Sequence, residues 1–239
     1  MTTTRTLPGQ DTLLACWSAL AQVSPGRLIS LPGATAAVFP ESAYLNNAIL
    51  DGNDAEATVV RLAALYADAG VQSWAAWVPS PAVEFGGADQ RATIAGLTRD
   101  ITNLVMHTDL ADGLPRHSGV VRASIADVER LDVGEPRPAT RLGRPDPVPG
   151  LTAWVLVEDG VAVAGAYTYQ YGSDCGVYAV GTRPEWRRRG LARALVRHAL
   201  ADAFDHGART ASLQSTPMGQ PLYESLGFRA AGRYEEWTH

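Results

Sequence analysis

The chain of 239 residues contains no lysine. All twenty of its Lys and Arg residues are arginine. Genomic base composition is the simplest origin of such a bias. The bias still has a chemical consequence, since arginine stays protonated and forms no Schiff base. Covalent catalysis through a lysine amine is therefore excluded.

Cysteine and long apolar runs are also scarce. The two cysteines, Cys16 and Cys175, are far apart and have neither metal nor redox spacing, so we expect two reduced thiols. No apolar run approaches the 18 residues that a membrane-spanning helix needs. The segment "MTTTRTLPGQD" lacks the apolar centre of a secretory signal. We therefore expect a cytoplasmic protein with no membrane partner.

Positive charge is not in excess either. Acidic residues number 25 and the formal net charge is −5, which disfavours binding to a nucleic-acid backbone. None of the five histidines has metal-ligand spacing with a third ligand, so we expect no metal site. Hydrophobic content of 46% and charged content of 19% are typical of a globular protein.

The first half of the chain alternates between strand and helix patterns. Residues 11–20 predict a short helix, and residues 27–39 predict strands interrupted at Pro32-Gly33. Residues 54–70 predict an amphipathic helix with Asp54 at its N-cap and Gly70 at its end. Three further predictions follow along the chain: a strand over 71–79 ended by Pro79, a helix over 89–97, and a strand over 102–110.

A polar segment rich in Gly and Pro, residues 111–119, predicts a boundary between a domain over 1–115 and a domain over 117–239. In the second half, Ser124 and Asp127 are spaced as a capping box, and Asp159-Gly160 predicts a hairpin turn. Residues 134–150 form a loop rich in Pro and Arg. The remaining predicted elements are a strand over 176–182, a helix over 191–204, a strand over 210–216, a short helix over 220–226 and a strand over 233–237.

The segment "RPEWRRRGLA", residues 183–192, lies between a predicted strand and a predicted helix. The first amides of a helix are unpaired and carry a partial positive charge, and Gly190 allows an anion to approach them closely. The segment is neither a phosphate loop of the Gly-x-x-x-x-Gly-Lys type nor a Gly-x-Gly-x-x-Gly turn. It predicts an anion site, with a solvated arginine-rich turn as the alternative.

Two motifs together resemble the GNAT superfamily of acyl-CoA-dependent N-acetyltransferases. One is the turn Arg-x-x-Gly-x-Ala, formed by Arg187, Gly190 and Ala192 after a strand. The other is "LYESLGF", residues 222–228. They occur in the family's order, and the resemblance covers roughly residues 117–239. It implies a mixed α/β (α+β) fold with a central sheet flanked by helices.

The resemblance also implies a cofactor, acetyl-CoA, and positions that bind it. The backbone amides of 188–193 correspond to those that hold the pyrophosphate, and the preceding strand holds the pantetheine arm. The implied cofactor-binding residues are Val180, Gly181, Thr182, Arg187, Arg188, Arg189, Gly190, Leu191, Ala192, Arg193 and Thr216.

Tyr223 matches the family's tyrosine that protonates the departing thiolate. Two positions depart from the family pattern. Thr216 stands where many members have asparagine, and Gly176 stands where many have a glutamate base. The base is therefore open among Asp174, Cys175, Tyr178 and Glu158, or the amine loses its proton to water.

Residues 1–115 carry neither motif, yet their order of elements is similar to a degenerate GNAT half; an unrelated small α/β domain is the alternative. We expect this half to bind no cofactor and to help form the acceptor pocket. The resemblance implies direct acetyl transfer to a primary amine of a small molecule or peptide in a ternary complex, by a monomer or homodimer. The alternatives are a catalytically silent CoA-binding regulatory or scaffold protein, and a nucleic-acid module using residues 187–189. In the loop 134–150, Arg137, Arg141 and Arg144 either favour an anionic acceptor or are solvated.

Overall fold

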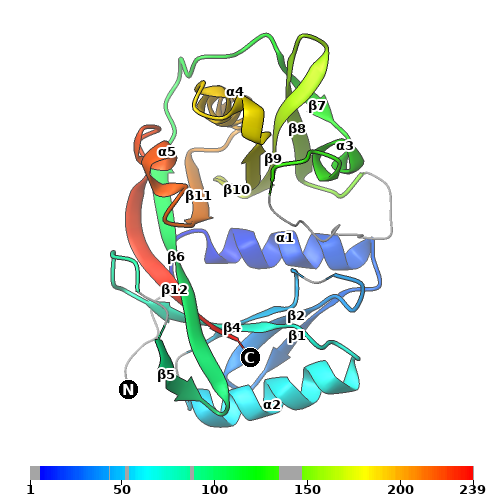
Figure 1. Ribbon diagram of the computed structural model, residues 1–239, viewed down its shortest axis with the longest axis vertical. Coiled ribbons are helices and arrows are strands. Elements are labelled where there is room, and N and C mark those ends of the chain that lie inside the picture. Colours follow the sequence, from blue (N-terminus) through cyan, green and yellow to red (C-terminus); the bar gives the residue numbers. More distant parts are fainter. Residues whose placement is uncertain (1–5, 43, 52–53, 87–88, 135–146, 239) are drawn as a thin grey trace.

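The computed structural model describes residues 6–42, 44–51, 54–86, 89–134 and 147–238. In these residues twelve strands form one strongly twisted mixed sheet, with helices on both faces (Figure 1). This is the predicted fold class. No helix among the described residues is long and apolar enough to cross a membrane.

The first half contributes two longer helices and the strands of one end of the sheet. Asp54 caps α2 as predicted, because its side chain accepts a hydrogen bond from the Ala57 amide at 3.3 Å. The elements are α1 (Gln10–Gln22), β1 (Arg27–Leu31), β2 (Ala34–Val38), β3 (Asn47–Leu50), α2 (Ala55–Asp68), β4 (Ala75–Ser80), β5 (Asp89–Ile94) and β6 (Leu97–Asp109).

The prediction of a helix over residues 89–97 is wrong. These residues form β5, a turn at Ala95-Gly96 and the start of β6. Both turn residues have positive φ, 45° and 89°, and Thr93 pairs with Thr98 across the hairpin. The Ala-Gly turn and the β-branched neighbours therefore prevail over the helical spacing. The strand over 71–79 also differs, because Pro79 lies inside β4 opposite Tyr234 and does not end it.

The second half matches its predicted elements. The predicted capping box of Ser124 and Asp127 is present, and Asp159 and Gly160 turn the hairpin with positive φ. The elements are β7 (Val120–Ala123), α3 (Ile125–Glu129), β8 (Leu151–Glu158), β9 (Val161–Tyr171), β10 (Asp174–Thr182), a 3-10 turn (Pro184–Trp186), α4 (Leu191–Asp205), β11 (Thr210–Ser215), α5 (Gln220–Glu224) and β12 (Arg229–Thr238).

The order of the strands shows that the two halves exchange their last strands. The sheet runs β1-β2-β3-β4-β12-β6-β11-β10-β9-β8-β7, with β5 beside β6. Thus β12, from the second half, pairs with β4 of the first, and β6, from the first half, pairs with β11 of the second. The division at residue 115 stays a prediction, but hydrogen bonds of the sheet cross it.

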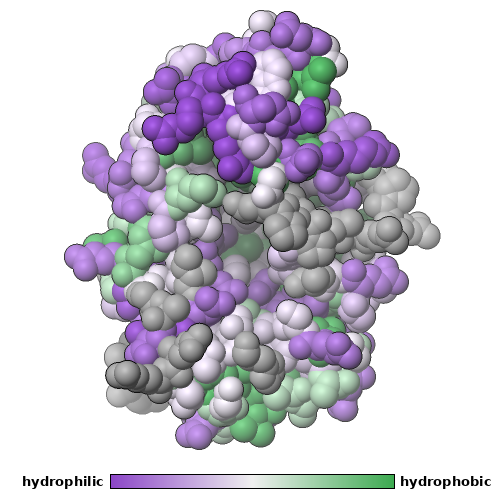
Figure 2. All heavy atoms as spheres, in the orientation of Figure 1, coloured by the Kyte–Doolittle hydropathy of each residue, from purple (hydrophilic) through white to green (hydrophobic). Residues whose placement is uncertain are grey.

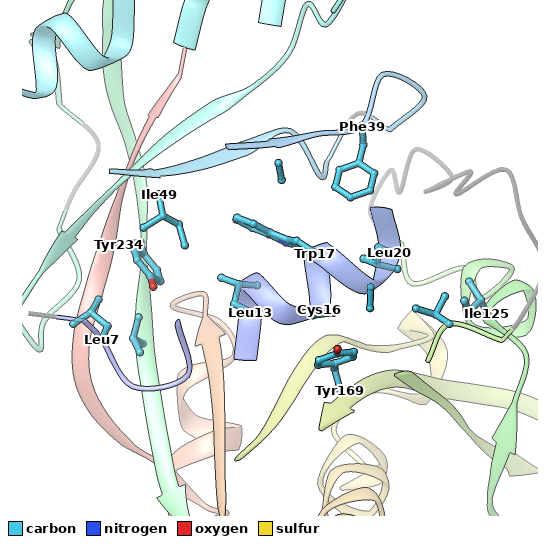
Figure 3. Close-up of a cluster of buried hydrophobic side chains, with 14 residues drawn as sticks. Leu7, Leu13, Cys16, Trp17, Leu20, Phe39, Ile49, Ile125, Tyr169 and Tyr234 are labelled. Carbon is cyan, nitrogen blue, oxygen red and sulfur yellow. The ribbon is translucent and has the colours of Figure 1, made fainter. Parts of the chain in front are cut away.

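Helix α1 lies between the two ends of the twisted sheet (Figure 1). Its apolar side chains pack on both ends: the Trp17 ring contacts the Trp77 ring of β4 at a tilt, with 5.9 Å between ring centroids, and Cys16 belongs to the same buried cluster as Tyr169 of β9 (Figure 3). The opposite face of β8–β10 packs on α4. The second half is thereby held between α1 and α4.

Candidate functional site

Strands β10 and β11 separate from each other near the middle of the sheet. They are parallel and paired only from Asp174–Thr210 to Gly176–Ser212. Beyond Gly176, β10 bends at a bulge between Tyr178 and Gly181, where Ala179 has a φ of 51°. Among the described residues, the edge of β10 that faces β11 therefore has no strand partner from Val180 to Thr182, where it can hydrogen-bond an extended ligand.

The turn after β10 presents its backbone at the start of α4. Arg188 and Gly190 both have left-handed φ, 65° and 79°, and Gly190 is the N-cap of α4 without a side-chain cap. The first amides of α4 consequently have no helical partner. A Cβ built on Gly190 would meet only Nη2 of Arg193, at 3.8 Å, so the space before these amides is open. An anionic group fits there.

Two of the three consecutive arginines, Arg187 and Arg189, have side chains with different partners. Arg187 donates from Nε to the Thr182 carbonyl at 3.3 Å and from Nη2 to the Val133 carbonyl, which fixes the turn to β10. Arg189 turns away, since its guanidinium lies 4.7 Å from the Trp186 ring centroid and donates to the Glu185 carbonyl. Exposed arginines make this end of α4 hydrophilic, and Figure 2 shows hydrophilic side chains gathered over α4.

A cavity of about 700 Å³ connects the turn, the unpaired edge of β10 and α5. It brings together every predicted site residue except Arg189. Sequence reasoning missed several residues that also line it. They are Val133, Ala179, Trp186, Gln214, Met218, Gly219 and Leu222. Gln214 precedes the predicted position Thr216 by two residues on β11, and only the alternation of strand faces could have pointed to it.

Tyr223 borders this cavity from α5. Its ring is nearly buried and meets the Phe228 ring edge-on, with 5.9 Å between centroids. Burial raises the pKa of the Tyr223 phenol to about 12, so the hydroxyl is protonated at neutral pH. In the described residues no group hydrogen-bonds this hydroxyl, which leaves it available to a ligand.

Thr216 lines the cavity at the end of β11, but its hydroxyl has a local partner. The amide of Gly219 donates to Oγ1 of Thr216 at 3.3 Å, so the side chain helps to form the turn before α5. This bond is long and leaves the hydroxyl hydrogen free to rotate toward a ligand.

The four candidate bases do not converge on this cavity. Asp174 accepts hydrogen bonds from the hydroxyls of Thr12, Thr210 and Ser212, at 2.6–2.8 Å, on the α1 side of the sheet. Cys175 is fully buried toward α4, and burial raises the pKa of its thiol to about 12. Glu158 ends β8, away from the cavity lining.

Tyr178 occupies the space above Gly176, where a Cβ would lie 2.2 Å from the Tyr178 hydroxyl. Burial raises the pKa of Tyr178 well above the usual value, so its hydroxyl keeps its proton at neutral pH and cannot act as the base. The base therefore stays unassigned. In the described residues no group of three His, Cys, Asp or Glu side chains could hold a metal, and Arg137, Arg141 and Arg144 lie outside them.

The Acetyltransferase (GNAT) family matches residues 123–228. Residues 123–228 form a GNAT acetyltransferase domain. The match covers α3 to α5, and with them the turn, the edge of β10 that faces the cavity, and Tyr223. The chain therefore contains an acyltransferase domain, of a family that binds acetyl-CoA and acts on amines. A search of curated proteins found no match to the sequence.

Solved structures share the fold along nearly the whole chain. A GCN5-related N-acetyltransferase from Kribbella flavida is 17% identical, with a TM-score of 0.67, over 95% of this chain and 94% of that one. A GNAT-family acetyltransferase from Novosphingobium aromaticivorans is 21% identical, with a TM-score of 0.61, over 93% and 95%. A tandem GNAT protein of the clavulanic acid pathway is 16% identical, with a TM-score of 0.62, over 100% and 90%. The fold likeness thus includes residues before the GNAT domain.

Proposed function

We propose that this chain transfers the acetyl group of acetyl-CoA directly to a primary amine in a ternary complex. The observation that carries the proposal is one cavity that joins three features. They are an uncapped helix N-terminus, an unpaired strand edge and a protonated tyrosine.

The cavity fits the shape and charge of the cofactor. The amides of 188–193 and the open space at Gly190 would hold its phosphates, with Arg188 and Arg193 adding positive charge. The unpaired edge at Val180, Gly181 and Thr182 would hold the amide-bearing arm, as a neighbouring strand does. Bound acetyl-CoA supplies an acetyl group activated as a thioester.

Residues of the chain would then position the acetyl group and protonate the sulfur that leaves. A backbone amide near the β10 bulge would polarise the acetyl carbonyl, in the manner of an oxyanion hole. Tyr223 holds a proton on Oη and would deliver it to the sulfur that leaves. Cys175 is buried on the α4 side with a raised pKa, which argues against an acyl-cysteine step. Since no carboxylate lines the cavity among the described residues, the amine would lose its proton to water.

Residues 1–115 would serve as a structural half without a cofactor of its own. They supply β6 beside β11, and α1 against β9 and β10, so they would shape the side from which the amine enters. A cytoplasmic location stays a prediction from the sequence.

A thiol-release assay over classes of primary amines, with acetyl-CoA as the donor, tests the proposal. We expect turnover with at least one class and saturable CoA binding by calorimetry. CoA binding without thiol release on any amine would instead identify a catalytically silent CoA-binding protein. If the chain neither bound CoA nor released thiol, the assignment of the cavity as the acetyl-CoA site would be wrong.

A further inference from the structure

A row of polar side chains runs from the cavity along the face of the sheet that α1 covers. Val105 and Tyr234 belong to the buried cluster around α1. Because strand side chains alternate between faces, Asn103 on β6 and Glu236 on β12 lie on this same face. Nδ2 of Asn103 donates to Oε2 of Glu236 at 3.0 Å, which joins the two.

The strand register places this row beside the cavity. Ser215 pairs with Leu104, so the next positions are Thr216, which lines the cavity, and Asn103. Asn103 in turn pairs with Tyr234, two residues before Glu236. With standard strand spacing and rise, Glu236 lies roughly 12 Å from the end of β11.

Glu236 is a half-buried carboxylate without a countercharge. No Arg or His of the described residues lies within ion-pair distance of it, whereas the neighbouring Glu235 pairs with Arg233. Burial, followed by the nearby Asp100, raises the pKa of Glu236 to about 7, and the bond from Asn103 opposes this. An ionised carboxylate in such a place is stabilised by a cation that arrives with a ligand.

Aromatic rings stand beside this carboxylate. Trp77, which pairs with Glu236 across β4 and β12, is partly buried between Trp17 and Tyr234, with ring centroids at 5.9 and 5.3 Å. Its Nε1 is close enough to lower the pKa of Glu236, but it is buried and has no hydrogen bond of good geometry. Aromatic faces next to a carboxylate are typical of sites for organic ammonium groups.

We infer that Glu236, with Asn103 and Trp77, binds a second cationic group of the acceptor amine, so that the enzyme prefers acceptors with two ammonium groups. The inference rests on the proposed function and names the substrate class of that site. Glu236 is too far from the cavity to touch the reacting amine, so it is a positioning residue. The cavity and the polar row then differ in charge: arginines and helix amides would hold the phosphates, and Glu236 would hold the second cationic group of the acceptor.

Matched pairs of acceptors test this inference at pH 8, where most Glu236 side chains are ionised. Diaminoalkanes of four to eight carbons are compared with alkylamines of equal length, in the wild type, Glu236→Gln and the control Glu235→Gln. A charged hydrogen bond contributes enough that Glu236→Gln should raise KM for diamines about tenfold or more. KM for the alkylamines and for acetyl-CoA should stay unchanged, and the control should behave as the wild type.

Glu236→Gln should not destabilise the fold, because glutamine is neutral, as is the protonated form of Glu236 that burial favours. The melting temperature of Glu236→Gln at pH 8 should equal or exceed that of the wild type. If the wild type has the same KM for alkylamines and for diamines of equal length, the inference is wrong while the proposed function stands. The same holds if Glu236→Gln retains the preference for diamines.

Where no amine of either series is acetylated, calorimetric titration of diamines in the presence of CoA decides. Diamine binding that Glu236→Gln abolishes supports the inference, and its absence in the wild type overturns it. CoA titration of the same samples and the wider thiol-release screen report separately on the proposed function.

Discussion

Replacing Gly190 with alanine tests the anion site, because it should change CoA affinity much more than the stability of α4. Gly190 has a φ of 79°, and its Cβ would have open space, so the substitution adds only backbone strain to the folded state. That strain costs about 1 kcal/mol, which for a chain of this size lowers the melting temperature by roughly 2–4 °C. The new methyl group would occupy the space in which the phosphates approach the amides of α4.

The expected loss of CoA affinity is much larger than the loss of stability. Hydrogen bonds to charged groups contribute about 1.5–3 kcal/mol each, so losing two of them weakens binding by roughly 100-fold or more. Calorimetric titration with CoA measures this directly. Gly207→Ala is the matched control, because Gly207 follows the other end of α4 with a φ of 98° and a Cβ there would have nothing within 4 Å.

Both variants should therefore melt at similar temperatures, and only Gly190→Ala should lose CoA binding. Equal CoA affinity in the two variants would refute the assignment of the phosphates to this turn.

Three further predictions concern the catalytic side chain, a rejected base and the division of the chain. Tyr223→Phe should lower kcat about 100-fold at unchanged KM for acetyl-CoA. Because burial raises the pKa of Tyr223 to about 12, wild-type kcat should not fall between pH 7 and 10; a fall near pH 10, or an active Phe variant, would assign the acid elsewhere. Asp174→Ala should remove the acceptor of three hydroxyls and cost about 3 kcal/mol, seen as a lower melting temperature with KM for acetyl-CoA retained; loss of kcat at an unchanged melting temperature would instead make Asp174 the base. A fragment of residues 117–239 lacks β6, so it should show no cooperative thermal transition and should aggregate on size exclusion; a monomer with a sharp transition would contradict this.

Local signals in the sequence predicted most of the elements of the second half, and the resemblance to the GNAT superfamily pointed to part of the cavity lining. Gly190 and the helix behind it, the capping box at Ser124 and the turn at Asp159-Gly160 each depend on neighbours in sequence, which is why pattern reasoning found them. The side chain of Arg189 was assigned to the site only through its motif position. Its stacking on Trp186 depends on the tertiary path of the turn, which spacing does not reveal.

Long-range pairing was beyond such reasoning. Residues 89–97 have helical spacing, but the pairing of β5 with β6 decides their conformation. The exchange of β6 and β12 between the halves left no local mark, and neither did the bond between Asn103 and Glu236, which joins residues 133 positions apart. The residues that we assign to acceptor recognition were missed because they meet only through that exchange.

The place of β12 also bears on how the chain acquires its structure during synthesis. β4 and β6 both leave the ribosome long before β12, yet they are neighbours of β12 and not of each other. The sheet of the first half therefore cannot close until the ten residues of β12 have been synthesised. Until then, the edges of β4 and β6 are open to pairing with other chains. Assembly of both halves is thus coupled to the synthesis of β12, and a chain whose synthesis stalls before β12 would have neither half assembled.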